Sequence, residues 1–248
     1  EIINKTMDRA DLDVPRAREI VRELDKLVAQ LRDAGIGISS WYGTFDLANH
    51  DDPSEKINRG YGYTPLEGAA DDVNFPWFLY WEIAWVTMHA DIRPGQKLID
   101  LGGSSSLFSY YLASKGVRVT TVDIQEHLVE NAQLVAAQTG WPLENYCMDI
   151  RDMSIESSFD HITSICVFEH IPMYDRVSIN RKITELLRSG GRFSITVDYR
   201  NPSMEARIAS PADIREQFVK PSGMKLRGNA EFHDNGKNYL LHPFYSRP

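Results

Sequence analysis

The stretch Lys97-Leu-Ile-Asp-Leu-Gly-Gly-Ser-Ser-Ser-Leu-Phe-Ser-Tyr-Tyr-Leu-Ala-Ser-Lys-Gly116 predicts a strand, a glycine turn and a helix. Its apolar start is typical of a short buried strand, which is interrupted by the acidic Asp100. Gly102 and Gly103 let the backbone turn sharply and leave room for a ligand to approach. The serines that follow can cap the helix, which we expect to end at the last glycine of the stretch.

A second strand is predicted directly after this helix, over residues 117–123, and it ends in Asp123. Strand, glycine loop, helix, strand and terminal acid form a nucleotide-binding unit, with the acid about 20 residues beyond the loop, where it can reach a ribose hydroxyl. A dinucleotide site would need the pattern G-x-G-x-x-G, which Ser104 and Ser106 interrupt. Asp100 suits a ligand with a cationic end better than a pyrophosphate.

Length and charge narrow the class of protein. The chain has 248 residues, enough for one good core with an appendage, and a net charge of -8, which argues against an extended nucleic-acid surface. Cys147 and Cys166 form neither a disulfide framework nor a zinc spacing, so we expect a cytoplasmic protein. No apolar run approaches the roughly 20 residues of a membrane span. Because the sequence starts at Glu1 rather than methionine, we expect it to be trimmed or cut from a longer protein.

The segment before the glycine turn predicts a helical cap. A helix is expected from Asp13 to Gly35, with apolar residues spaced three and four apart, and it either packs on its own domain or pairs two subunits in a homodimer. Residues 35–74 are rich in Gly, Pro, Asp and aromatic residues, which indicates a lid over a pocket or an ordinary packed loop. The helix predicted over residues 75–90 has tryptophans on one face, and Glu82 among them would need a partner if it is buried.

Strands alternate with helices after the glycine turn, which predicts an α/β fold with a parallel sheet covered on both faces. Further strands are expected at residues 143–149, 158–168 and 192–198, and further helices at 125–139, 177–187 and 211–219. Two last strands, at residues 224–227 and 239–244, would form a hairpin around Asn235-Gly236.

Acidic residues recur within or just after these strands. They are Asp100, Asp123, Asp149, Glu169 and Asp198. Each of them alone has a structural explanation as a turn or cap residue. Because ligands of open α/β sheets bind outside the carboxyl ends of the strands, together they indicate a polar ligand held across this edge.

The order of these motifs resembles that of class I S-adenosylmethionine (SAM)-dependent methyltransferases of the small-molecule type. The family's first motif is usually D/E-x-G-x-G-x-G; this chain keeps Asp100 and Gly102 and has Ser104 and Ser106 where glycines are usual. The resemblance spans residues 93–244 and implies a Rossmann-like, doubly wound sheet of seven strands, parallel except for a C-terminal hairpin. It also implies a helical cap or lid over residues 1–92 and a SAM-binding domain over residues 93–248.

The resemblance implies SAM as the methyl donor, S-adenosylhomocysteine as the product, and a set of contacts. Asp123 would bind both ribose hydroxyls, and Asp149 would accept from the adenine amine unless it only caps a helix. The Cys166 carbonyl would meet the amino group of SAM unless the residue is plain core. The complete cofactor set comprises Asp100, Gly102, Gly103, Ser104, Asp123, Ile124, Asp149, Ile150 and Cys166, with Tyr63 of the lid.

The pair Glu169-His170 lies where the substrate and the donor methyl group meet in this family. His170 is a candidate general base because its ordinary pKa is about 6.5, and its alternative role is to bond to the neighbouring loop. Ubiquinone-pathway O-methyltransferases bind a metal with Glu-x-x-Glu-His; here Cys166 replaces the first Glu, so we expect no metal. The predicted substrate-binding residues are Tyr61, Asp198 and Tyr199.

The sequence therefore predicts a methyltransferase that acts on an oxygen or nitrogen of a small polar molecule. The N-P-P-Y/F motif of enzymes that methylate amino groups of DNA and proteins is missing after the fourth strand. One alternative is a catalytically silent methyltransferase-like domain that serves as a partner or scaffold. A less favoured alternative is an NAD(P)-dependent oxidoreductase, which would need a phosphate-binding glycine loop and commonly a Tyr-x-x-x-Lys relay; neither is found.

Overall fold

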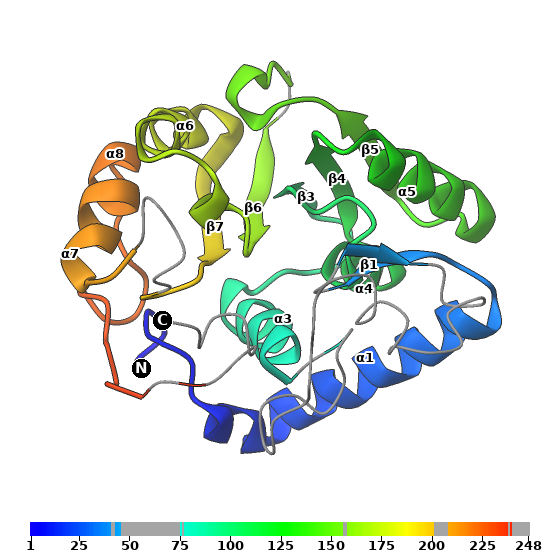
Figure 1. Ribbon diagram of the computed structural model, residues 1–248, viewed down its shortest axis with the longest axis horizontal. Coiled ribbons are helices and arrows are strands. Elements are labelled where there is room, and N and C mark those ends of the chain that lie inside the picture. Colours follow the sequence, from blue (N-terminus) through cyan, green and yellow to red (C-terminus); the bar gives the residue numbers. More distant parts are fainter. Residues whose placement is uncertain are drawn as a thin grey trace, which may run out of the picture.

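The computed structural model describes residues 1–40, 43–45, 75, 77–155, 158–200, 208–237 and 239. Its centre is a parallel sheet with the strand order β5–β4–β3–β6–β7 (Figure 1). The strands are β3 (Lys97–Leu101), β4 (Arg118–Asp123), β5 (Leu143–Cys147), β6 (Phe159–Ile165) and β7 (Leu187–Thr196). Every neighbouring pair in this sheet runs parallel, so the carboxyl ends of all five strands share one edge.

Helices cover both faces of the sheet, because side chains of successive strand residues point to opposite sides. Leu98 packs into a core with helices α1 (Pro15–Asp33), α3 (Trp77–Ala90), α4 (Leu107–Ser114) and α5 (Glu126–Thr139). Its neighbour Ile99 packs into a second core on the other face. That core includes residues of α6 (Met173–Leu186), α7 (Pro211–Ile214) and the π-helical turn Arg215–Val219, which continues into α8 (Lys220–Ser222). The prediction of a doubly wound α/β fold is confirmed.

The described sheet has five strands rather than the predicted seven. The hairpin was expected to supply the other two, but residues 224–227 form no strand. Of its second predicted strand, only Tyr239 belongs to the described part of the chain. A short antiparallel pair, β1 (Ile38–Ser40) and β2 (Gly43–Phe45), lies outside the main sheet and was not predicted. The lid residues Tyr61 and Tyr63 lie outside the described residues.

Helix α1 packs against α3 and α4 of its own chain. It begins at Pro15 after a 3-10 turn (Arg9–Asp13), two residues later than the predicted start at Asp13, and Gly35 follows its end with φ +67°. Its buried face holds Ala17, Ile20, Leu24, Leu27, Val28 and Leu31. Val14, which precedes the helix, is 43% exposed. Of the two interpretations of this helix, the structure shows the packing within the chain.

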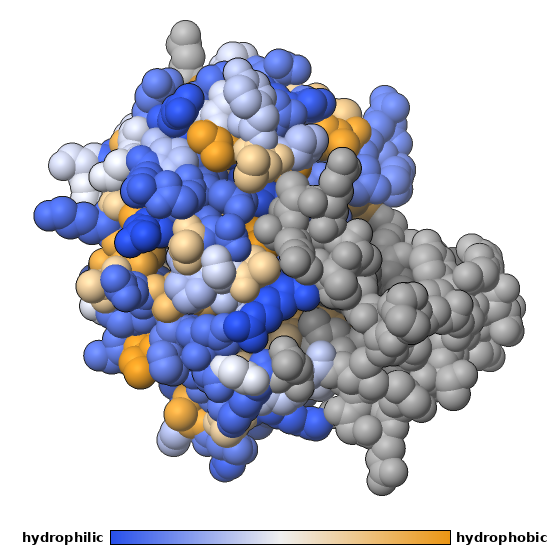
Figure 2. Space-filling model, turned by 60° about the vertical axis from the view of Figure 1, so that its left-hand side comes forward, coloured by the Kyte–Doolittle hydropathy of each residue, from blue (hydrophilic) through white to orange (hydrophobic). Residues whose placement is uncertain are grey.

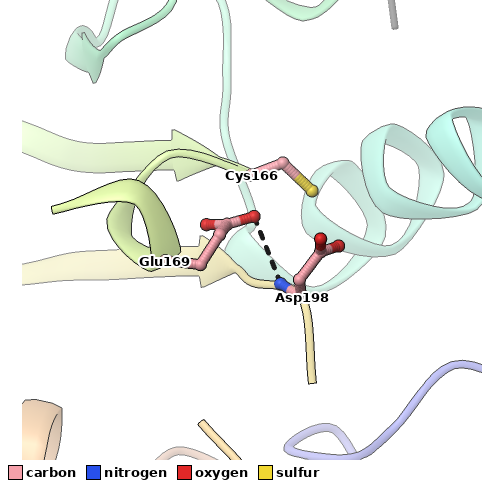
Figure 3. Close-up of side chains that lie close together, drawn as sticks. All are labelled: Cys166, Glu169 and Asp198. Carbon is pink, nitrogen blue, oxygen red and sulfur yellow. Dashed lines mark hydrogen bonds between the residues drawn. The ribbon is translucent and has the colours of Figure 1, made fainter. Parts of the chain in front are cut away.

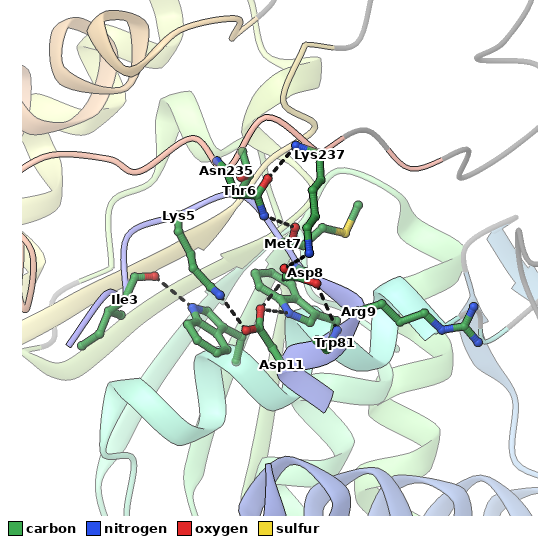
Figure 4. A network of polar contacts seen from close by, with 12 residues as sticks. Ile3, Lys5, Thr6, Met7, Asp8, Arg9, Asp11, Trp81, Asn235 and Lys237 are labelled. Carbon is green, nitrogen blue, oxygen red and sulfur yellow. Dashed lines mark hydrogen bonds and ion pairs between the residues drawn. The ribbon is translucent and has the colours of Figure 1, made fainter. Parts of the chain in front are cut away.

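The first residues of the chain run beside its last described segment, and both lie over α3 (Figures 1 and 4). Thr6 N donates to His233 O at 3.0 Å, and Asn235 N donates to the hydroxyl of Thr6 at 3.0 Å. Trp81 of α3 donates from its indole nitrogen to Asp11 at 2.9 Å. The two bonds of Thr6 join residues more than 200 positions apart, and the joined segments form one wall of the cavity described below.

The surface is rich in hydrophilic residues, as the share of charged residues in the sequence leads one to expect. The coloured residues of the face shown in Figure 2 are mainly hydrophilic, and the hydrophobic ones among them are scattered or in small groups. Within the described ranges, no helix has the length and apolar character needed to cross a membrane.

Candidate cofactor and acceptor site

The glycine turn after β3 is packed too tightly for any larger residue. Gly102 has φ +75°, and a Cβ added there would come within 2.6 Å of the Val167 side chain. A Cβ added at Gly103 would lie 1.9 Å from Oδ2 of Asp100, where no atom fits. The turn therefore needs both glycines, and through Val167 it touches the segment that follows β6.

Asp100 lies beneath this turn rather than in the open. It is 1% exposed, and its two carboxyl oxygens accept hydrogen bonds from the hydroxyls of Ser109 and Thr163, each at 2.8 Å. Burial raises the pKa of Asp100 to about 6, although the two hydroxyls act in the opposite direction. The residue is thus held beneath the turn by these two hydroxyls.

The serines that replace the family's glycines direct their hydroxyls into the protein. Ser104 is 1% exposed, and its Oγ lies 2.7 Å from the hydroxyl oxygen of Thr121 on β4. Ser106 caps α4 by accepting from the backbone nitrogen of Ser109 at 3.0 Å. Because both side chains are taken up by these bonds, the departures from the glycine pattern stabilise the turn.

Asp123 ends β4 beside the turn, with an apolar residue next to it. Its Oδ1 accepts from the backbone nitrogen of Gln125 at 3.0 Å. Burial raises the pKa of Asp123, and backbone N–H groups, including that of Ser104, partly offset this. Ile124 is 67% exposed, unusual for a large hydrophobic residue. A carboxylate beside an exposed apolar side chain fits a ribose and the base attached to it.

Asp149 follows β5 and caps a 3-10 turn (Ile150–Asp152), the alternative that the sequence left open. It accepts from the backbone nitrogen of Arg151 at 2.8 Å, and its Oδ2 lies 2.6 Å from Nη2 of the same residue. The Arg151 guanidinium therefore lowers the pKa of the Asp149 carboxyl. Ile150 is buried behind it.

A cluster of acidic groups lies beyond the ends of β6 and β7, where Cys166, Glu169 and Asp198 converge (Figure 3). Oε1 of Glu169 accepts from the backbone nitrogen of Asp198 at 3.2 Å. Candidate ligand atoms of these three residues all lie within 4.8 Å of one another. Glu82 of α3 completes the cluster, because its Oε1 lies 2.8 Å from Sγ of Cys166. We call these four residues the acid cluster.

The acid cluster is short of hydrogen-bond partners. Glu82 is 7% exposed and Glu169 is 4% exposed. Within the described part of the chain, Oε2 of each has no hydrogen-bond partner. Burial, reinforced by Asp198, raises the pKa of Glu82 to about 7 and that of Glu169 to about 8. One carboxyl oxygen of each residue is thus buried away from water and has no hydrogen-bond donor within the described part of the chain.

The structure separates the predicted pair Glu169-His170. Glu169 is buried in the acid cluster, whereas the His170 side chain is exposed. The 3-10 turn that holds both (Phe168–His170) directs neighbouring residues to different sides, and His170 donates its backbone N–H to Val167 O at 3.0 Å. The predicted role of His170 as general base has no support from this geometry.

A metal ion could be held by Cys166, Glu169 and Asp198, but the thiol is poorly suited to it. Burial and the surrounding carboxyl groups raise the pKa of the Cys166 thiol well above its ordinary range. A thiol ligand must be deprotonated to bind a metal. A metal bound by these three residues would therefore have to displace the thiol proton.

A cavity of about 520 Å³ opens beside the acid cluster, between α3, β7 and the two chain ends. Asp198 and Tyr199, both predicted to bind substrate, line this cavity together with Glu82 and Cys166. The Tyr199 hydroxyl donates to Asp234 at 3.2 Å. The sequence did not single out Glu82 as a functional residue; the only signal was an acid on an otherwise aromatic helix face.

The chain is similar to known methyltransferases. A family model described as "Methyltransferase domain" matches residues 99–195. The ubiquinone biosynthesis O-methyltransferase of Idiomarina loihiensis is 29% identical over 64% of this chain and 70% of its own length. That of Xanthomonas campestris pv. campestris is 30% identical over 52% of this chain and 59% of its own.

Among solved structures, an S-adenosylmethionine-dependent methyltransferase from Clostridium acetobutylicum is 21% identical, with a TM-score of 0.39 over 42% of this chain and 43% of that one. The domain match covers the segment from β3 into β7, which contains the glycine turn, Asp123 and Glu169. This segment therefore carries the similarity of the chain to methyltransferases.

Proposed function

We propose that the chain transfers the methyl group of SAM to an oxygen or nitrogen of a small molecule. The observation that carries this proposal is the contact of Gly102 with Val167. It brings the glycine turn next to the segment that leads into the acid cluster and its cavity. A donor held at the turn and an acceptor held in the cavity would then meet at the carboxyl ends of β3 and β6.

The residues present suit SAM on the cofactor side. Gly102 and Gly103 carry no side chains that could keep a ligand from the backbone of the turn. Asp123 offers a carboxylate that can accept from both ribose hydroxyls. Ile124 would pack on the adenine, with Asp149 and the Ile150 amide at its edge. The backbone of residues 102–104 and the Cys166 carbonyl would hold the methionine part, and Tyr63 stays a predicted lid contact.

When bound, SAM supplies an electrophilic methyl group on a positively charged sulfur. The protein then has to align the acceptor, exclude water and take up a proton. We assign the proton to Glu169 rather than His170, because Glu169 is buried beside the cavity's acidic end and has one unpartnered oxygen. Asp198 and Tyr199 would position the acceptor.

The size of the cavity favours a small acceptor. Small-molecule sites commonly measure about 300–1,000 Å³, and this cavity of about 520 Å³ falls in that range. The relatives are named as O-methyltransferases of ubiquinone biosynthesis, which is consistent with a small-molecule acceptor. The homodimer and the division of the chain at residue 92 stay predictions.

The experiment that tests this proposal follows the methyl group. The chain is incubated with methyl-labelled SAM and a cell extract, and label is counted separately in protein, nucleic acid and small molecules. We expect label in the small-molecule fraction that is lost with Asp123→Ala and kept with Asp25→Ala, which alters an exposed acid of α1. Label in protein or nucleic acid, or no label above a blank, would overturn the proposal.

A further inference from the structure

We propose that the methyl acceptor is an amine, carried on an apolar or aromatic skeleton, whose nitrogen binds at the acid cluster. This inference rests on the proposed function and names the acceptor class of the same site. Its starting point is the pair of buried, unpartnered carboxyl oxygens, one on Glu82 and one on Glu169. A buried carboxyl group is costly unless a donor or a positive charge meets it.

The described part of the chain supplies no such charge. Within the described residues, no Lys or Arg lies within ion-pair distance of Glu82 or Glu169. Arg176 of α6 is buried close to the 3-10 turn that contains Glu169. Its guanidinium, however, donates to the backbone carbonyls of Phe168 and Ile171, at 2.8 and 2.9 Å, and to the Gln217 side chain.

The cations that line the same cavity are bound to other groups. Lys5 pairs with Asp11 at 2.6 Å, Arg192 with Asp91 at 3.3 Å, and Arg200 with Asp234 at 2.5 Å. Lys237 pairs with Asp8 at 2.5 Å, Arg227 donates to the carbonyl of His89 at 2.5 Å, and Lys225 is exposed. The acidic end of the cavity is therefore left for a positively charged or hydrogen-donating ligand.

The cavity walls favour an organic cation over a bare ion. Aromatic side chains line it from α3, β7 and the C-terminal segment: Phe78, Trp81, Trp85, Phe193, Phe232 and Tyr239. Trp81 and Trp85 stack with ring centroids 5.3 Å apart. Aromatic faces bind apolar skeletons and also attract ammonium groups.

A divalent metal is the competing occupant, and the cluster is poorly built for it. Sγ of Cys166 and Oε1 of Glu82 lie 2.8 Å apart, which requires a proton between them. A metal would have to displace that proton and form a thiolate. An amine needs no such change, because it donates to the oxygens as they stand.

The acid cluster can also take up the proton that is released when a methyl group is transferred to an amine nitrogen. The bound ammonium group first gives one proton to the Glu169 carboxylate, which frees the lone pair of the nitrogen. This lone pair forms a bond to the methyl carbon, and the bond from that carbon to sulfur breaks with its electron pair going to sulfur. The sulfur becomes a neutral thioether, and the methylated amine leaves as an ammonium ion, so that charge and atoms balance.

Matched ligands test this inference without knowing the natural acceptor. Binding of 2-phenylethylamine, tyramine and tryptamine is compared with binding of the alcohols 2-phenylethanol, tyrosol and tryptophol, which lack the amino group. Calorimetry is done on the full chain saturated with S-adenosylhomocysteine. We expect at least one amine to bind about tenfold more tightly than its alcohol, as one charged hydrogen bond of about 1.5 kcal/mol implies.

Variants of the acid cluster test whether it causes the preference for amines over alcohols. Glu82→Gln and Glu169→Gln should each abolish the amine-over-alcohol preference while leaving S-adenosylhomocysteine binding unchanged. Glu130→Gln, which alters an exposed acid of α5, should change neither. The preference of the unaltered chain is measured independently, so a variant that fails to fold does not remove the test.

Three results would overturn the inference. Equal binding of all three amines and their alcohols would show that the cavity does not select a cation. Loss of S-adenosylhomocysteine binding in the folded Gln variants would assign the acid cluster to the cofactor. Tight binding of Mn²⁺ or Zn²⁺ alone that excludes the amines would make it a metal site. Failure of the proposed function itself differs from all three, because the chain would then not bind S-adenosylhomocysteine at all.

Discussion

Sγ of Cys166 lies 2.8 Å from Oε1 of Glu82, a residue 84 positions earlier in the chain. This contact joins α3 to the carboxyl end of β6. It places an acid of the N-terminal helices in the cavity between α3, β7 and the two chain ends. Helix α3 is therefore part of the candidate site as well as a cover for the sheet.

Stability should fall as pH rises through the range in which the acid cluster ionises. The pKa values of Glu82 and Glu169 are raised to about 7 and about 8, above the ordinary 4.5, so the folded protein binds more protons than the unfolded chain. Their contribution is fully present below the ordinary pKa and is lost above the folded values. Thermal unfolding measured from about pH 5 to about pH 9 should show this decline.

The double variant Glu82→Gln/Glu169→Gln should show a clearly flatter decline, because neither amide ionises. Glu130→Gln, at an exposed position, should follow the unaltered chain. An equally steep decline in the double variant would contradict the assignment of the pH dependence to the acid cluster.

Gly103→Ala should weaken both the fold and cofactor binding. The added methyl group would overlap Oδ2 of Asp100, and such overpacking costs about 1–3 kcal/mol. Gly236→Ala is the comparison, because it meets no atom within 4 Å and costs only the strain of a left-handed residue. Denaturant unfolding and S-adenosylhomocysteine titration measure the two effects. Unchanged binding with Gly103→Ala would show that the turn does not hold the cofactor.

Ser104→Gly restores the family's glycine pattern, and it should destabilise this chain. The hydroxyl of Ser104 is buried against that of Thr121, and losing such a hydrogen bond costs about 1 kcal/mol. Cofactor binding should stay within about threefold, since the backbone makes the proposed contacts. A gain in stability on denaturant unfolding would refute the view that the serine hydroxyls stabilise the turn.

His170→Ala should retain most methyl transfer, whereas Glu169→Gln should lose about 100-fold or more, the usual contribution of a general base. The reason is placement: Glu169 is buried beside the cavity's acidic end, and His170 is exposed. The measurement is the turnover rate with an acceptor found by the labelling experiment. If the turnover rate fell equally in the two variants, His170 would again be a candidate for the general base.

The fold was largely predictable from the sequence, because its signals are local. Apolar runs marked the five strands of the sheet, and the glycines at 102–103 and 116 marked turns that the structure requires. The last two strands were not predictable in the same way. Residues 224–227 pack beside the start of the chain instead, where Asn4 bonds to Arg227 and Asn229. That pairing depends on segments more than 220 positions apart.

The cofactor side of the candidate site was also predictable, because Asp100, Asp123 and the turn belong to one continuous strand–helix–strand unit. The acceptor side was not predictable, because its residues come from distant parts of the sequence. Glu82 meets Cys166 only after α3 has packed beside β6 and β7, and no spacing in the sequence encodes that contact. Glu169 and His170 are neighbours in sequence, but the 3-10 turn that holds them buries Glu169 and leaves His170 exposed, a difference that the motif alone does not predict.

Calorimetric titration with S-adenosylhomocysteine tests the central claim most directly. The unaltered chain should bind it with a micromolar dissociation constant. Asp123→Ala should bind it at least about tenfold more weakly, because a loss of 1–2 kcal/mol follows when ribose hydroxyls are left unpaired. Asp25→Ala should bind like the unaltered chain. No binding to the unaltered chain at millimolar ligand, or equal binding to Asp123→Ala, would contradict the account.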